Sequence, residues 1–222
     1  MSQGKDAMSS TAVSVSEAVQ NNPAHSALIL GVSDLLTQEL GNETIRWDTR
    51  FDSRGRELLV LHATDAFEGE VEKEFAPDEF LEHYRDHLQR RFYDIKGALV
   101  RVGQWKKAVK KLYSEIESWS ASLKPRPFCM QEPIVVKEQL SGPYSINRLV
   151  ISYGSNSIVF RPVAAWIVAG QGRVDVDGPD GTAELILAEQ NEWKLNTFDR
   201  RNPFVTFDQS EFERLVSCII SN

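Results

Sequence analysis

The chain has 222 residues, of which 41% are apolar and 26% are charged, a composition typical of a globular protein that can bury a core. Two cysteines, Cys129 and Cys218, are too few for the disulfide framework of a secreted protein. The N-terminus lacks the basic start and apolar stretch of a signal peptide, and the apolar run at 163–170 is too short to cross a membrane. These features predict a cytoplasmic protein that does not associate with a membrane.

The net charge of −7 is unevenly distributed along the chain. Residues 85–111 hold nine basic and two acidic side chains, whereas the preceding segment 65–82 is strongly acidic. A chain that is acidic overall lacks the domain-wide basic balance of a committed nucleic-acid binder. The simpler expectation is that the acidic and basic segments pair, within one chain or across a dimer.

The first half of the chain predicts a tail, a helix and a hairpin. Residues 1–22 are rich in Ser, Thr, Gln and Asn, so we expect a disordered tail. Apolar residues at helical spacing predict a helix over 23–40, which Gly41 ends. The alternation at 44–51, a turn, and a return strand at 57–63 predict a β-hairpin. An acidic connection then leads into the next helix.

The most regular pattern is an apolar residue at every seventh position between residues 81 and 123. Six heptads exceed the three or four that suggest a coiled coil, so we predict a long helix that needs a partner. Gly97 and Gly103 each cost about 1 kcal/mol relative to alanine in a helix interior, which leaves two helices, 77–96 and 104–123, as the alternative. The positions expected to form the interface are Leu88, Ile95, Val102, Trp105, Val109, Leu112, Ile116 and Trp119.

The second half predicts a linker and a β domain. Three prolines in 125–133 disfavour regular helix, so we expect an extended linker. Short strand-like runs with turn signals then predict antiparallel strands, and an apolar stripe after Asp208 predicts a C-terminal helix over one sheet face. The predicted class is α+β: an N-terminal helix and β-hairpin, a long heptad-patterned helix or helical hairpin, then an antiparallel β-meander domain closed by a C-terminal helix. The two expected domains are 23–124 and 134–222.

One motif suggests catalysis. Pro179-Asp180 followed by Glu192-Trp193-Lys194 has the form of the PD-(D/E)xK nuclease motif, in which two carboxylates hold Mg²⁺ or Mn²⁺ and the lysine stabilises charge on the phosphate. Glu192 and Lys194 would project from the same side of a strand. So short a pattern often arises by chance, and a hairpin turn followed by an edge strand explains it equally well. The sequence therefore leans away from an enzyme.

A second pattern suggests a metal site. His83 and His87 are four residues apart, which places them on one face of a helix at the spacing of a helical metal site. However, Tyr84 stands where a metalloprotease helix carries its catalytic glutamate. Two surface histidines are the simpler interpretation.

A third pattern suggests nucleic acid. Basic residues on the helix could follow a phosphate backbone. The candidates are Arg90, Arg91, Lys106, Lys107, Lys110 and Lys111.

The leading hypothesis is a non-enzymatic interaction or regulatory protein. Its heptad helix would mediate self-association or docking to a protein partner, and its C-terminal sheet would present a recognition surface. The unbroken repeat and the lack of a strong catalytic motif favour this hypothesis. The alternatives are a metal-dependent nuclease using Asp180, Glu192 and Lys194, and a nucleic-acid-binding module using the basic helix 85–111.

Overall fold

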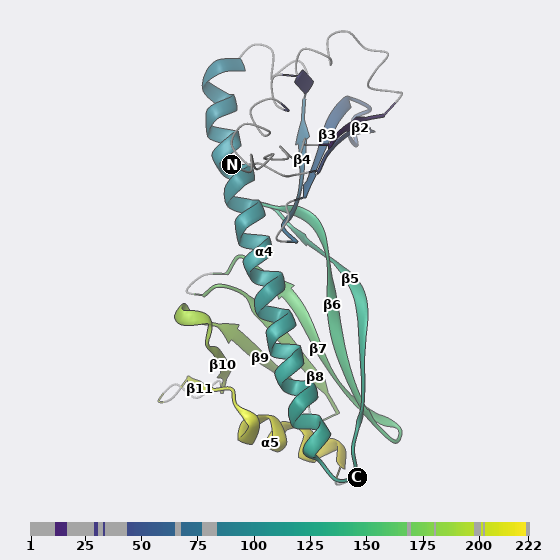
Figure 1. Cartoon of the computed structure of the whole chain (residues 1–222), viewed down its shortest axis with the longest axis vertical. Helices are drawn as coiled ribbons and strands as arrows, with labels where there is room; N and C mark the ends of the chain where they lie inside the picture. The colour runs from purple at the N-terminus through teal and green to yellow at the C-terminus, as the bar shows by residue number, and fades with distance from the viewer. Residues whose placement is uncertain are drawn as a thin grey trace, which may run out of the picture. The chain divides into compact units, whose positions relative to one another are not determined.

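The computed structural model forms two compact units that share one helix (Figure 1). It describes residues 12–16, 29–30, 33, 44–64, 68–76, 84–167, 170–179, 181–197, 201 and 203–220. The first unit comprises residues 1–103 and 139–142, and the second comprises residues 104–138 and 143–222.

The first unit contains a four-stranded sheet in the order β1-β2-β3-β4. Its strands are β1 (Ala12–Val15), β2 (Thr44–Phe51), β3 (Glu57–Thr64) and β4 (Glu70–Phe75). Strand β1 runs parallel to β2, and the other pairs are antiparallel. The turn between β2 and β3 forms because the Asp52 carboxylate accepts hydrogen bonds from the backbone N–H groups of Arg54 and Arg56, at 2.8 and 2.9 Å.

The core of the first unit is centred on Trp47. Alternation along β2 directs Ile45 and Trp47 to the same buried face. The Trp47 ring lies 5.8 Å from the ring of Phe75 on β4, and its Nε1 donates a hydrogen bond to Ser33 Oγ at 3.0 Å. The indole N–H is therefore satisfied although it is buried.

The second unit contains a seven-stranded sheet in the order β11-β10-β9-β8-β7-β6-β5. Its strands are β5 (Phe128–Glu138), β6 (Gly142–Tyr153), β7 (Asn156–Ala164), β8 (Arg173–Gly178), β9 (Gly181–Leu187), β10 (Trp193–Asn196) and β11 (Phe204–Thr206). From β6 to β11, each strand pairs antiparallel with its neighbour. Strands β5 and β11 therefore form the two edges of the sheet.

Two helices cover one face of this sheet. Helix α4 (Tyr84–Ser122) runs through both units, and its part after Gly103 lies along the seven-stranded sheet (Figure 1). Helix α5 (Gln209–Ile220) begins after Asp208, whose carboxylate accepts a hydrogen bond from the Glu211 backbone N–H at 3.1 Å. Trp119 at the end of α4 packs against Phe212 of α5, with ring centroids 5.7 Å apart. The second unit is thus a two-layer arrangement of helix on sheet.

The apolar stripe of α4 is buried by the sheet of its own chain. Trp105 packs on Trp193 of β10, and the Tyr113 hydroxyl donates a hydrogen bond to the Phe160 carbonyl of β7 at 2.9 Å. The stripe residues Trp105, Val109, Leu112 and Ile116 are all at most 2% exposed. These residues form the core of the second unit.

The predicted fold class is wrong. It expected an N-terminal helix and β-hairpin, a long helix and one β-meander domain, whereas the described part of the chain is mainly β and forms two sheets, of four and seven strands. The segment at 70–75 is strand β4, because Val71 and Phe75 alternate with glutamates that face the other way; the run of charge concealed this period of two. Likewise the expected hairpin is only half of a larger sheet.

Other boundaries also differ from those expected. Strand β5 begins at Phe128, within the segment expected to be a linker, and it contains Pro133; an edge strand tolerates proline because one row of its N–H groups has no partner strand. The boundary between the units falls inside α4, which continues through Gly97 and Gly103. Strand β1 lies within the expected tail. Of the expected helix at 23–40, only three positions fall among the described residues, and they are helical.

Candidate functional site

Of the residues expected to form a coiled-coil interface, seven have described side chains, and six of these are buried. Ile95 and Val102 are also at most 2% exposed, and Trp119 is half-buried against Phe207 and Phe212. The side chain of Leu88 lies outside the described residues. A heptad interface would have to expose the stripe, so this part of the interaction hypothesis is corrected: the stripe is core.

The structure describes only part of the nuclease motif, Glu192 and Lys194, because Asp180 lies outside the described residues. Lys194 Nζ lies 2.8 Å from Glu192 Oε2 and donates a hydrogen bond to Thr206 Oγ1 at 3.0 Å. This contact with Lys194 lowers the pKa of the exposed Glu192 carboxyl. Strand β9 starts at Gly181, five residues before Ile186, the partner of Lys194 on that strand. At about 3.3 Å per residue that is roughly 16 Å along the strand.

The other two alternatives gain little from the structure. His83 and the His87 side chain lie outside the described residues, and within the described part no three metal-ligating residues gather. Of the basic candidates, the side chains of Arg90 and Arg91 are likewise not described.

The four lysines named as nucleic-acid-binding candidates lie on α4. Lys107, Lys110 and Lys111 are exposed, and Lys111 lies 3.8 Å from Glu115 one turn later. The Lys106 ammonium lies 6.0 Å from the centre of the Tyr144 ring, at the limit of a cation–π contact. In the part of the chain that the structure covers, no helix is both long and apolar enough to cross a membrane.

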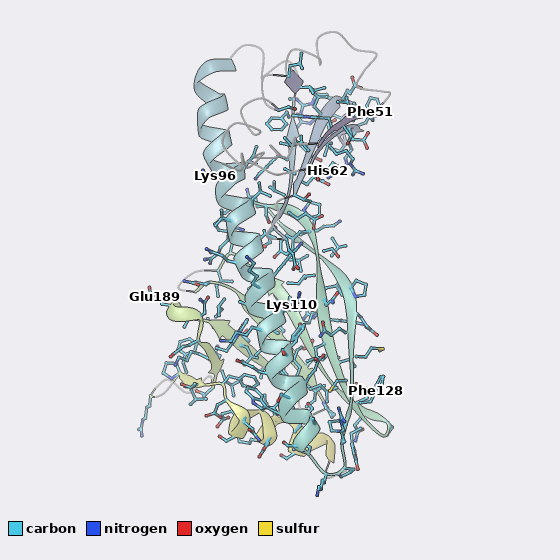
Figure 2. All side chains as sticks on the ribbon, viewed as in Figure 1. Phe51, His62, Lys96, Lys110, Phe128 and Glu189 are labelled. Atoms are coloured by element: carbon cyan, nitrogen blue, oxygen red, sulfur yellow. The ribbon has the colours of Figure 1, made fainter. Side chains whose placement is uncertain are left out.

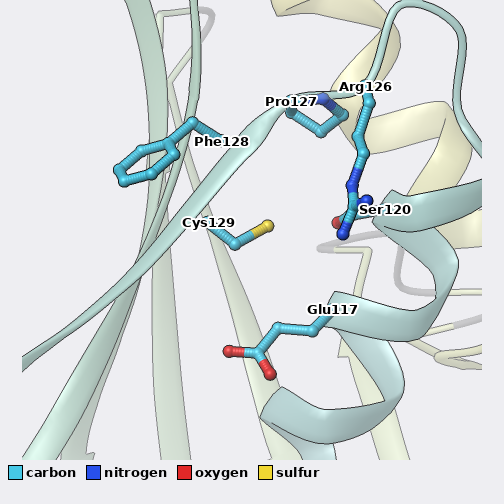
Figure 3. A pocket seen from close by; sticks show the side chains of 6 residues that line it. All are labelled: Glu117, Ser120, Arg126, Pro127, Phe128 and Cys129. Atoms are coloured by element: carbon cyan, nitrogen blue, oxygen red, sulfur yellow. The ribbon is translucent and has the colours of Figure 1, made fainter.

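A pocket of about 530 Å³ lies between the last turns of α4 and the start of β5 (Figure 3). Helix α4 ends at Ser122 because Pro125 and Pro127 follow, and the chain then turns back into β5. This reversal places the start of β5 beside the last turns of the helix. The lining residues are Glu117, Ser120, Arg126, Pro127, Phe128 and Cys129.

Two small polar side chains face each other in this pocket. Ser120 is 1% exposed, and its Oγ has no hydrogen-bond partner among the described residues. Burial raises the pKa of the Cys129 thiol, and the nearby Ser120 hydroxyl offsets only part of that rise. The two groups are neighbours, but they do not form a hydrogen bond of normal geometry. The thiol is therefore protonated near neutral pH and is a poor nucleophile.

The charged groups of the pocket differ in how they are held. Glu117 Oε1 accepts a hydrogen bond from Gln131 Nε2 at 2.8 Å, and Gln131 Oε1 accepts one from Asn147 Nδ2 at 3.3 Å. This chain of contacts across α4, β5 and β6 fixes the Glu117 carboxylate. Arg126 is exposed and forms no ion pair with any residue that the structure describes.

Next to the pocket, β5 carries large exposed apolar side chains. Phe128 is 66% exposed, Met130 is 41% exposed and Val135 is 63% exposed. Figures 2 and 3 show Phe128 at the start of the strand, with its ring directed away from α4, while Cys129 Sγ points toward the helix. Sequence reasoning missed this site because the prolines suggested a linker, although the alternation of Phe128 and Met130 is itself a strand signal.

Comparison of the chain with protein-family models, curated proteins and solved structures finds no match.

Proposed function

We propose that the chain is a non-enzymatic binding protein that pairs an extended segment of a partner protein with the outer edge of β5. One observation carries the proposal: β5 is an eleven-residue edge strand with three large exposed apolar side chains. The β-sheet recognition surface expected from the sequence is thereby assigned to one strand, while the helix stripe is assigned to the core.

Edge strands favour this kind of binding because one row of their N–H and C=O groups has no partner strand. A segment of another protein can satisfy those groups by adding one more strand to the sheet. Proteins commonly prevent unwanted pairing of an edge strand with other chains by keeping that strand very short, and β11 at the opposite edge has only three residues. Strand β5 is not shortened, and Pro133 removes only one donor, so we place the pairing at residues 128–132.

The chemistry of the neighbouring pocket supports binding rather than catalysis. The Cys129 thiol has a raised pKa, and the Ser120 hydroxyl has no base within hydrogen-bond reach among the described residues. Neither group is activated for attack on a substrate.

The test is selection of ten-residue peptides from a random displayed library on the whole chain. Binders should shift the backbone amide resonances of residues 128–132. Met130→Lys places a charge on the edge and should weaken binding about tenfold or more, because strand addition is disfavoured by an edge lysine. Phe204→Lys is the matched control, since Phe204 is 48% exposed on the opposite edge strand β11 and should leave binding unchanged.

Two results would overturn the proposal. Binders could map to other surfaces and be insensitive to Met130→Lys. Alternatively, the free chain could be a dimer that Met130→Lys dissociates, in which case β5 binds a second copy of this chain rather than a partner segment.

A further inference from the structure

We propose that the pocket beside β5 is a carboxylate-binding subsite, which receives the side chain of an aspartate or glutamate in the partner segment. The inference rests on the proposed function and adds the chemistry of one partner residue. It starts from two polar groups of the pocket: Arg126, which forms no ion pair with a described residue, and Ser120, whose hydroxyl has only the weakly accepting Cys129 thiol beside it and no hydrogen bond of normal geometry to any described residue.

Arg126 supplies the positive charge. Its guanidinium is planar, remains charged at every physiological pH and matches the two oxygens of a carboxylate. It forms no ion pair within the described part of the chain, so an incoming carboxylate does not have to displace one. The apolar ring of Pro127 would pack against the methylene groups of the incoming aspartate or glutamate side chain.

Ser120 supplies a hydroxyl donor from the helix. Buried polar groups are nearly always hydrogen-bonded, because a buried group without a partner costs free energy. Ser120 is 1% exposed, lines the pocket, and leaves its Oγ without a partner among the described residues. A carboxylate oxygen in the pocket would accept a hydrogen bond from that hydroxyl.

The remaining groups favour an anion over a cation. Glu117 is the acidic residue of the pocket, and its Oε1 already accepts a hydrogen bond from Gln131. The protonated Cys129 thiol adds no negative charge. Glu117 keeps its negative charge, but a cationic occupant would also meet Arg126, whereas an anionic one placed beside Arg126 would meet its guanidinium and the Ser120 hydroxyl. Figure 3 shows Arg126 and Ser120 directed toward the space in front of Cys129 Sγ, with Glu117 earlier along the helix.

The experiment uses the ¹⁵N-labelled whole chain and two probes, N-acetyl-glutamate N-methylamide and its glutamine counterpart. The probes differ only in replacing a carboxylate with an amide. The glutamate probe should bind about tenfold more tightly at pH 7, because hydrogen bonds to a charged group are the stronger ones. It should shift the amide resonances of Ser120 and Cys129, and binding should be lost below the glutamate pKa of about 4.3.

Variants connect the preference to the two donors. Arg126→Gln and Ser120→Ala should each reduce the preference for the glutamate probe, whereas Lys124→Gln, which removes an exposed charge two residues before Arg126, should preserve it. Equal shifts from both probes, or none from either, would overturn the subsite.

The edge-strand proposal is tested separately. Met130 does not line the pocket, so Met130→Lys should weaken peptide binding about tenfold or more and leave the probe preference intact. A carboxylate preference without peptide binding would refute the proposed function alone.

Discussion

Trp105 on α4 and Trp193 on β10 pack against each other, with ring centroids 5.8 Å apart and ring planes tilted by 51°. Both rings are buried, and a tilted arrangement at this distance is a favourable aromatic contact. The contact joins the seven-residue stripe of the helix to the sheet of the second unit. The heptad repeat of this helix therefore reflects its packing on a sheet and not on a second helix.

Leu112→Ala should destabilise the fold without changing its association state. Leu112 is fully buried on the stripe, and removal of a buried leucine side chain costs about 2–5 kcal/mol through lost burial and a residual cavity. Chemical denaturation measures the loss, and light scattering measures the mass. Lys110→Ala on the exposed side of the same helix should change stability by less than about 0.5 kcal/mol. A drop in mass with Leu112→Ala at unchanged monomer stability would restore the interface hypothesis.

Gly172→Ala should be strongly destabilising because two costs combine at this position. Gly172 has φ +153°, and a Cβ there would collide with the ring of Trp105, which is buried and cannot move aside. We expect a loss of about 2–4 kcal/mol in the free energy of unfolding. Gly154 also has positive φ, +58°, but open space around it, so Gly154→Ala should cost only about 1–2 kcal/mol. If the two variants lost the same free energy of unfolding, the collision with Trp105 would not contribute to the loss in Gly172→Ala.

Ser120→Ala should leave stability unchanged or increase it, although the residue is buried. The substitution removes a hydroxyl whose burial without a partner costs about 1–3 kcal/mol and leaves only a small void. Ser217→Ala on α5 is a useful comparison, because the Ser217 hydroxyl is exposed and donates a hydrogen bond to the Arg214 carbonyl at 2.7 Å. Its removal should change stability little. A loss above about 1 kcal/mol in Ser120→Ala would mean that the hydroxyl has a structural partner.

The sequence predicts individual elements better than their assembly. The strands at 44–51 and 57–63 and the helix after Asp208 follow from local alternation, turn chemistry and capping, which are properties of neighbouring residues. Which strands share a sheet depends on contacts distant in the chain. Neither the parallel pairing of β1 with β2 nor the position of β5 at an edge has a local signal.

The candidate site is even less visible in the sequence. Arg126 and Ser120 are six residues apart, but they meet only because the chain reverses between α4 and β5. That the buried Ser120 hydroxyl has no hydrogen-bond partner of normal geometry among the described residues is a property of the packed structure alone. By contrast, the trio of Asp180, Glu192 and Lys194 matches a known sequence pattern, but of its members the structure describes only Glu192 and Lys194, which form an ion pair with each other.

We predict that the free energy of unfolding depends on pH through His62 of β3, in the sheet of the first unit. Burial lowers the pKa of His62, and the charges of Arg46 and Arg50 lower it further. The carboxylates of Glu72, 3.2 Å from His62 Nδ1, and of Asp48 act in the opposite direction but do not overcome these effects. The folded chain therefore holds this proton more weakly than the unfolded chain, whose histidine pKa is about 6.5.

The sign of the effect follows from proton linkage. Below about pH 6.5 the unfolded chain binds more protons at this position, so the free energy of unfolding falls as the pH falls toward the lowered pKa of the folded state. Denaturation curves at pH 7.5 and pH 5 should show a smaller loss in His62→Gln than in the natural chain. Glu72→Gln is the matched variant: it removes the carboxylate that raises the pKa, so it should enlarge the loss between the two pH values. If all three chains lose the same stability between pH 7.5 and pH 5, His62 does not titrate with folding and the pH dependence arises elsewhere.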